Sequence, residues 1–290
     1  MPVPDRPGPT GPLEPTFLVI GAMKAGTTSL WHYLRAHPQI FMPDLKEFQF
    51  FSDERRWVEG MGWYRDHFQG GGGAVALGEA STGYTKYPRP EGVPARIAEA
   101  LPNVRLVYVV RDPIERIRSH YLHSVHKQRE TRPLADAIEA TPAYLAISRY
   151  RTQIDQYLEF FPREQLLVIT AEELRANRVA TLHRVFGFIG VDPGSAWDVA
   201  AHELHRSADK RTDTKVSETA RRLPGYRVAA RRLPGPLKRG YTGLATRSLV
   251  GDTNAEVSDA LRARLEAELL PEVDGLREFL EPGFDGWGIT

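Results

Sequence analysis

Short apolar runs alternate along the chain with segments in which apolar residues recur every three or four positions. The runs contain few polar residues and lie at 17–20, 40–42, 74–80, 104–110 and 165–169. Runs of this length and composition are typical of strands that are buried on both faces of a parallel sheet. We therefore predict five strands at these positions.

The segments with helical spacing follow or separate these runs. They lie at 27–36, 93–101, 113–126, 147–161, 171–188 and 260–279. His37-Pro38 should stop the first helix, and Asp112 and Pro113 are a favourable N-cap and first residue for the third. Alternating strands and helices predict an α/β fold, with a P-loop-type parallel sheet and helices on both faces, in a single domain. Ligands of such sheets bind beyond the carboxyl ends of the strands.

The composition limits what the rest of the chain can be. Residues 1–15 contain six prolines and two glycines, which predicts a disordered leader before a domain at 16–290. No apolar run approaches the ~20 residues of a membrane span, and the basic-then-apolar layout of a signal peptide is missing, so the simplest location is the cytoplasm. The absence of cysteine excludes disulfides, thiolate metal sites and cysteine nucleophiles.

The formal net charge of +1 hides an uneven distribution. Residues 215–247 contain nine Lys or Arg residues and a single acidic residue, Glu218. The repeated Arg-Arg-Leu-Pro-Gly at 221–225 and 231–235 should break any long helix there. The segment is either a solvated excursion or a mobile lid whose charge attracts an anionic acceptor or a membrane surface.

A phosphate-binding loop is predicted between the first strand and the first helix. Gly21 and Gly26 have the spacing of a P-loop, and hydroxyl residues follow at the start of a helix, where backbone N–H groups attract an anion. A nucleotide hydrolase would need a lysine at position 27, but this chain has Thr27 there and Lys24 inside the loop. The loop therefore suits a different phosphorylated nucleotide. The alternative is an ordinary glycine-rich turn.

A second anion site is predicted where the strand at 104–110 ends. Arg111 follows that strand, and Ser119 lies two turns into the next helix. A guanidinium fork and a hydroxyl together suit a terminal phosphate monoester. The alternative for Arg111 is a structural ion pair with Asp112 or another nearby carboxylate.

Three motifs in this order give the chain a specific resemblance. They are Lys24-Ala-Gly-Thr-Thr-Ser-Leu30, Lys46-Glu47-x-x-Phe50-Phe51, and the block from Tyr108 to Tyr121 that contains Arg111-Asp-Pro. Together they resemble the sulfotransferases that use 3′-phosphoadenosine 5′-phosphosulfate (PAPS), nearest to the heparan sulfate sulfotransferases and their bacterial relatives. The similarity extends over residues 16–190 and reappears near Trp287, which we expect to be a packing anchor.

The resemblance implies roles for individual residues. The loop residues that would bind the 5′-phosphosulfate are Lys24, Ala25, Gly26, Thr27, Thr28 and Ser29. Arg111 and Ser119 would hold the 3′-phosphate, and Lys210 and Arg211 would belong to a basic loop that closes over the nucleotide. Lys24 has independent support, because the chain has seven lysines against thirty-one arginines and a compact charge suits a leaving oxygen. No metal is required.

The acceptor must lose a proton, and four residues are candidates for the general base: Glu47, Glu79, His120 and His123. Glu47 fits best, because the heparan-type branch has its base just before x-x-Phe-Phe and the aromatic neighbours would desolvate the carboxylate. The alternative is a loop salt bridge with Lys46, and we expect both histidines to be packing or surface residues. Ala80 stands where heparan-type members often have a lysine, which puts an acidic polysaccharide acceptor in doubt.

We expect a PAPS-dependent sulfotransferase that releases 3′-phosphoadenosine 5′-phosphate (PAP). The acceptor would be a hydroxyl of a small molecule, a glycoside or a lipid-linked metabolite, and an amine is less favoured. Peripheral contact with a membrane is compatible with the basic segment, nucleic acid is not expected, and the oligomeric state stays open. The alternatives are a P-loop kinase for a small molecule, which should have a lysine at position 27, and a non-catalytic basic protein that binds a surface.

Overall fold

The protein is described here by a computed structural model, which covers residues 13–194, 212–213, 246–247 and 255–290. Its centre is a five-stranded sheet in the order β2-β3-β1-β4-β5, in which every neighbouring pair is parallel. The strands are β1 Phe17–Gly21, β2 Ile40–Phe41, β3 Ala76–Ala80, β4 Arg105–Val110 and β5 Leu166–Thr170. A short antiparallel pair, β6 Thr212–Asp213 and β7 Thr246–Arg247, is separate from this sheet.

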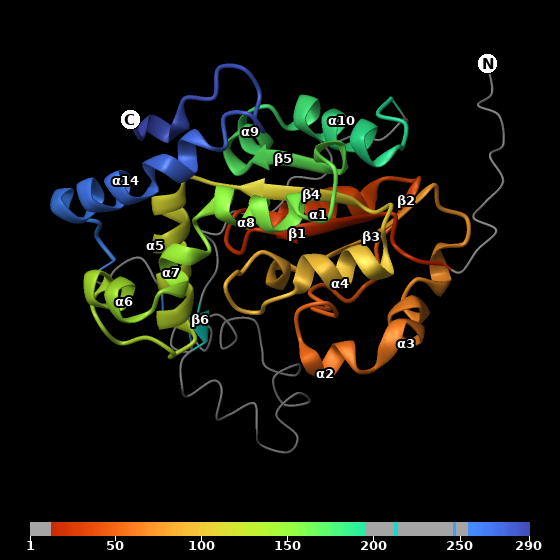
Figure 1. Ribbon diagram of the computed structural model, residues 1–290, viewed down its shortest axis with the longest axis horizontal. Coiled ribbons are helices and arrows are strands. Elements are labelled where there is room, and N and C mark those ends of the chain that lie inside the picture. Colours follow the sequence, from red (N-terminus) through yellow and green to blue (C-terminus); the bar gives the residue numbers. More distant parts are fainter. Residues whose placement is uncertain (1–12, 195–211, 214–245, 248–254) are drawn as a thin grey trace, which may run out of the picture.

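Helices connect the strands and cover both faces of the sheet. In the described part of the chain they are α1 Thr27–Ala36, α2 Glu54–Trp57, α3 Gly60–Asp66, α4 Val93–Ala100, α5 Pro113–His126, α6 Leu134–Ala140, α7 Ala143–Ala146, α8 Tyr150–Leu158, α9 Ala171–Ala176, α10 Arg178–Ile189 and α14 Asp259–Asp274. Helices α4 and α8 lie over the face that is nearer the viewer in Figure 1, and α1 lies behind the sheet. The predicted α/β fold is confirmed.

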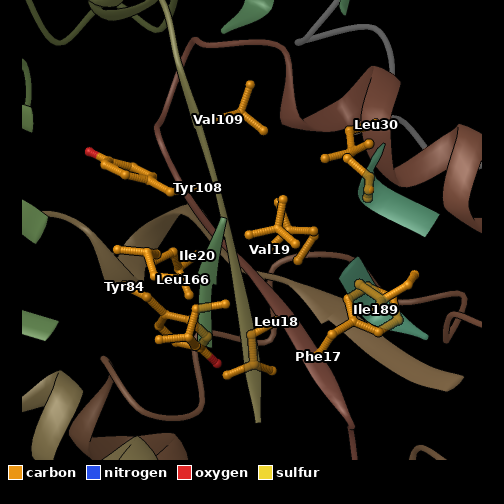
Figure 2. Packing of buried hydrophobic residues seen from close by; sticks show 14 of the residues in the cluster. Phe17, Leu18, Val19, Ile20, Leu30, Tyr84, Tyr108, Val109, Leu166 and Ile189 are labelled. Atoms are coloured by element: carbon orange, nitrogen blue, oxygen red, sulfur yellow. The ribbon is translucent and has the colours of Figure 1, made fainter. Parts of the chain in front are cut away.

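The central strand β1 is buried along its whole length, and its side chains alternate between the two faces. Val19 lies on the same side as Leu30 of α1 and Ile189 of α10, whereas Ile20 points to the side of Tyr84 and Tyr108 (Figure 2). Burial on both faces explains why the strand reads as a continuous apolar run. The carboxyl end of β1 is thereby held rigidly in the middle of the sheet.

A second hydrophobic cluster lies beyond the carboxyl edge of the sheet. Helix α5 leaves β4 at this edge, and α6, α7 and α14 gather around it (Figure 1). Ile117 of α5 and Leu265 of α14 are both buried in this cluster. The cluster anchors the outer side of the helix that carries Ser119.

Three helix predictions need correction, two at an end of the helix and one in its middle. The segment 147–161 forms a helix only from Tyr150, because the chain leaves the helical region at Arg149, where ψ is 74°. The segment 171–188 is divided at Asn177, whose φ of −124° and ψ of 47° are not helical. The last helix ends at Asp274, and Leu276 and Phe279 are buried in the turns that follow.

Several predictions fall on residues that are not described. Residues 1–12 of the predicted leader, Lys210, Arg211, and the basic segment 215–247 apart from Thr246 and Arg247 lie outside the described ranges. Glu14, near the end of the predicted leader, is described and pairs with Arg65 at 2.9 Å. None of the described helices is long and apolar enough to cross a membrane.

Candidate active site

The phosphate-binding loop, residues 21–26, connects β1 to α1 at the carboxyl edge of the sheet. Lys24 and Gly26 have positive φ values of 72° and 93°, which turn the chain sharply into the helix. Gly26 is the N-cap residue of the ten-residue helix α1 and has no side chain that could bond the first N–H groups. The N-terminal amides of α1, which begin at Thr27, can therefore bind an anion. The structure places the predicted residues 24–29 together in this loop and first turn.

Arg111 lies at the end of the adjacent strand β4 and contacts this loop directly. Its Nη1 donates to the carbonyl of Lys24 at 3.4 Å, and its Nη2 lies 3.4 Å from Glu115. Asp112 caps α5 and accepts from the amides of Ile114 and Glu115, so it is not the ion-pair partner of Arg111. The ion pair considered as the alternative role of Arg111 is thus only a 3.4 Å contact with Glu115.

Two further contacts hold the turn between β4 and α5, at Arg111 and Asp112, which we call the Arg111 turn. The hydroxyl of Tyr150 donates to the carbonyl of Arg111 at 2.8 Å, which ties the turn to α8. Glu172, at the start of α9, accepts from the indole of Trp287 at 3.1 Å and from the amide of Asp112 at 3.4 Å. Trp287 is therefore an anchor behind the turn. Ser119 is half-buried on α5.

The glutamate loop, residues 43–53, lies beside the end of β3. Glu47 has a φ of 64°, and its amide donates to the carbonyl of Ala80 at 3.0 Å. Its Oε2 accepts from the amide and the hydroxyl of Thr82 at 2.8 and 3.0 Å. Its Oε1 lies 2.5 Å from Nζ of Lys46, so the salt bridge that we weighed against a base role does form.

The aromatic residues of the glutamate loop are buried among other aromatic rings. Phe48, Phe50 and Phe51 are at most 2% exposed, and Phe50 stacks on Tyr64 with ring centres 4.6 Å apart. The side chain of Glu47 keeps 30% of its surface exposed. The carboxylate is consequently held by polar donors, and the expected desolvation by its aromatic neighbours is not what the geometry provides.

Glu79 lies under this loop and is only 1% exposed. Its carboxylate accepts from the hydroxyls of Tyr84, Ser81 and Tyr64 at 2.5, 2.7 and 3.1 Å. Burial raises the pKa of Glu79 to about 7, against the opposing effect of these hydrogen bonds. Because it is covered, Glu79 is not in a position to take a proton from a bound acceptor.

His120 is closer to the site than we expected from the sequence. Burial, together with the charges of Arg116, Lys86 and Lys24, lowers its pKa to about 3. Burial and Lys24 also lower the pKa of His123, on the same helix. Both imidazoles are therefore neutral at neutral pH and lie within electrostatic reach of Lys24.

The buried Arg116 lies beside His120. Its Nε donates to the hydroxyl of Ser148 at 2.5 Å, its Nη2 donates to the carbonyl of Tyr144, and its Nη1 lies 3.4 Å from Nδ1 of His120. Burial lowers the pKa of this guanidinium to about 10, so it stays charged at neutral pH. The charged guanidinium of Arg116 therefore lies beside the imidazole of His120 at neutral pH.

Lys86 lies near the site and was not predicted from the sequence. This residue follows Thr85, whose hydroxyl bonds the carbonyl of Ile20 at 3.0 Å, directly beside the end of β1. Burial lowers the pKa of Lys86, whereas the nearby carboxylate of Glu47 raises it. The scarcity of lysine, which singled out Lys24, could have identified Lys86 as well.

Lysines of the described chain concentrate at this site. Lys24, Lys46 and Lys86 come from three separate segments, and each either bonds or electrostatically affects a site residue. In the same described part, no group of three or more His, Asp or Glu side chains is arranged to hold a metal ion. The arrangement places the uncapped N-terminus of α1 and the guanidinium of Arg111, which could each bind an anion, on adjacent turns, and adds the partly exposed carboxylate of Glu47.

Comparison with known proteins identifies the family. A family model for the sulfotransferase domain matches residues 14–221, which is most of the chain. The chain therefore belongs to the sulfotransferase domain family. The family expected from the three motifs is confirmed.

Individual relatives agree with this assignment. The chain is 29% identical over 206 residues to the human bifunctional heparan sulfate N-deacetylase/N-sulfotransferase 2, covering 62% of this chain and 22% of that protein. It is 28% identical over 207 residues to the human heparan sulfate glucosamine 3-O-sulfotransferase 3B1, covering 65% of this chain and 51% of that protein. The chain thus spans a fifth to a half of the length of these relatives.

A solved structure is similar over nearly the whole chain. The crystal structure of a sulfotransferase from Alicyclobacillus acidocaldarius superimposes with a TM-score of 0.66 and 26% sequence identity, covering 95% of this chain and 99% of that one. The similarity includes the parallel sheet that carries the site.

Proposed function

We propose that the protein transfers a sulfuryl group from PAPS to a hydroxyl group of an acceptor. One observation carries the proposal: the phosphate-binding loop, the Arg111 turn and the glutamate loop meet at the carboxyl ends of β1, β4 and β3, which are neighbours in the sheet. The contact between Arg111 and the carbonyl of Lys24 joins the first two, and the bonds of Thr82 to Glu47 join the third to β3. Membership of the sulfotransferase family supports the same activity.

The residues present fit the donor. The helix N-terminus at Gly26 offers amides without a side-chain cap, and Lys24 adds a positive charge, so residues 24–29 would hold the 5′-phosphosulfate. Arg111 and Ser119 would hold the 3′-phosphate. Lys210 and Arg211, outside the described residues, stay predicted contacts to the nucleotide. When bound, PAPS supplies the sulfuryl group, whose S–O bond to the phosphate breaks as a new S–O bond forms to the acceptor.

The side chains of this site provide positioning and charge. Lys24 stabilises negative charge that develops on the leaving phosphate oxygen. Thr82 holds Oε2 of Glu47 with two hydrogen bonds, which leaves Oε1 to take the acceptor proton once Lys46 swings aside on its flexible stem. No metal-dependent step is part of this proposal.

The proposed class of acceptor rests on the relatives and on Ala80. The two human relatives are named for N-sulfation and 3-O-sulfation of heparan sulfate, which supports a glycoside among the small-molecule and lipid-linked acceptors considered above. Ala80, in place of the lysine expected there, argues against a long acidic polysaccharide. We retain a hydroxyl as the first choice and an amine as the second. Cytoplasmic location and peripheral membrane contact stay predictions.

Ligand-induced thermal stabilisation tests the donor. PAP should stabilise the fold by about 2.7 kcal/mol at a hundredfold excess over its dissociation constant. AMP lacks the 3′-phosphate and should therefore stabilise the fold less when it is added at the same concentration as PAP. Equal stabilisation by AMP would refute the role of Arg111 and Ser119. Stabilisation by ATP with magnesium, but not by PAP, would favour the small-molecule kinase, and no response to any nucleotide would favour a non-catalytic surface-binding protein.

A further inference from the structure

We propose that Glu79 is a positioning residue that fixes the glutamate loop, and with it the carboxylate of Glu47, through three hydroxyl groups. The inference rests on the proposed function only for the role of Glu47. It concerns a fully buried acid that no step of sulfuryl transfer uses directly.

Each hydroxyl donor of Glu79 also contacts the glutamate loop. Ser81 donates to Oε2 of Glu79 at 2.7 Å, and the same Ser81 oxygen accepts from the amide of Gln49 at 2.9 Å. The carboxylate therefore orients the Ser81 hydroxyl so that a lone pair faces the loop. The fixed amide belongs to a residue only two positions after Glu47.

The two tyrosine donors reach the aromatic end of the same loop. Tyr64 donates to Oε1 of Glu79 at 3.1 Å and stacks on Phe50, with ring centres 4.6 Å apart and planes 13° apart. Tyr84 donates to the same oxygen at 2.5 Å and packs edge-on against Phe51 at 5.6 Å. One carboxylate thus orders side chains that contact three consecutive loop residues.

The loop needs this support because its backbone is unusual. Glu47 and Gln49 have φ values of 64° and 54°, in the left-handed region that residues with a side chain seldom adopt. Such conformations persist only where surrounding contacts determine them. The bonds from the 79–84 segment, including those of Ala80 and Thr82 to Glu47, are those contacts.

A buried carboxylic acid is a costly way to join hydroxyl groups unless all of its bonds are made. Glu79 meets this condition, since both of its carboxylate oxygens accept hydrogen bonds from hydroxyl groups. Replacing the acid by an amide keeps the shape but places an N–H₂ group opposite one of the donors. Glu79→Gln therefore breaks the connection without emptying the site.

The experiment compares Glu79→Gln, Ser81→Ala and the double variant with the wild type. Glu99→Gln, which alters an exposed carboxylate on α4, is the matched control. Hydrogen exchange measured by mass spectrometry on peptides covering 45–53 reports the order of the loop. Titration with PAP reports the nucleotide site, and release of labelled inorganic sulfate from PAPS, with water as acceptor, reports turnover.

We expect each single variant to speed exchange in 45–53 and to lower the sulfate-release rate by about tenfold, with the PAP dissociation constant within twofold of wild type. The double variant should be no worse than the poorer single variant, because both changes break one connection. Unchanged exchange in either single variant, or effects that multiply in the double variant, would overturn the inference. A parallel loss of PAP affinity would also overturn it, since it would indicate general destabilisation.

The two proposals can fail separately. If the wild type binds no PAP and releases no sulfate, the proposed function fails, while the exchange measurement still decides whether Glu79 orders the loop. If the wild type is active and Glu79→Gln keeps its rate, only the positioning role is refuted. Ser81→Ala tests the same connection if Glu79→Gln does not fold.

Discussion

Replacing Glu79 by glutamine should change how the free energy of unfolding depends on pH. Glu79 is buried, and its pKa rises from the ordinary 4.5 to about 7 in the folded protein. The unfolded chain exposes the carboxyl group, so it ionises near 4.5 there. Between these two pH values the folded state keeps a proton that the unfolded state has lost.

The sign and size of the effect follow from this difference. Below pH 4.5 the carboxyl is protonated in both states, and its contribution to stability is fully present. As the pH rises to about 7 this contribution is lost, and it amounts to roughly 3 kcal/mol. Above about pH 8 both states are ionised, and no further loss occurs.

Urea unfolding followed by tryptophan fluorescence, at pH values from 4 to 8, measures this contribution. The stability of the wild type minus that of Glu79→Gln should fall by roughly 3 kcal/mol between pH 4.5 and 7 and then stay level. Taking the difference removes the titration of groups that both proteins share. Glu99→Gln should show no comparable decline relative to the wild type. A difference that is independent of pH, or that grows with pH, would refute the raised pKa of Glu79.

Two substitutions and one titration also test the site. Glu47→Gln should lower turnover on the order of a hundredfold while PAP binding, measured by calorimetry, stays close to wild type. Glu99→Gln is the control, and normal turnover in Glu47→Gln would mean that another residue is the general base. Arg111→Ala should weaken PAP binding at least about tenfold but leave AMP binding nearly unchanged, and an equal loss for both nucleotides would contradict a specific 3′-phosphate contact. The His120 imidazole, with its pKa near 3, should show no titration by NMR between pH 5 and 8; a midpoint near 6.5 would place it outside the charged site.

The strands could be predicted because most of their residues are buried. In β1 and β4 nearly every side chain contacts the core, so the apolar pattern is continuous and its ends are clear. The helix boundaries near Arg149 and Asn177 could not be read in this way. Apolar spacing continues through both breaks, since buried residues lie on either side of each, Ile147 and Tyr150 at the first and Leu174 and Leu182 at the second.

The candidate site, like the fold, could be predicted from the sequence only in part. The phosphate-binding loop and Arg111 are local motifs, in which a strand end, a glycine and a helix start are adjacent in the sequence. The position of Lys86 and the hydrogen bonds of Glu79 depend on side chains that only the fold brings together. Tyr64, for instance, reaches Glu79 from a helix that the apolar pattern did not predict.

The strand order has a consequence for how this chain acquires its structure. Phe17 of β1 pairs with Gly78 on one side and Arg105 on the other, so the first of the five sheet strands to be synthesised is the central one. Its two edges stay open until β3 and β4 have emerged, and unpaired apolar edges promote association between chains. Such long-range pairing is slow to form. The nascent chain should therefore need protection from aggregation until about residue 110 has left the ribosome, and fragments that end before β4 should be insoluble.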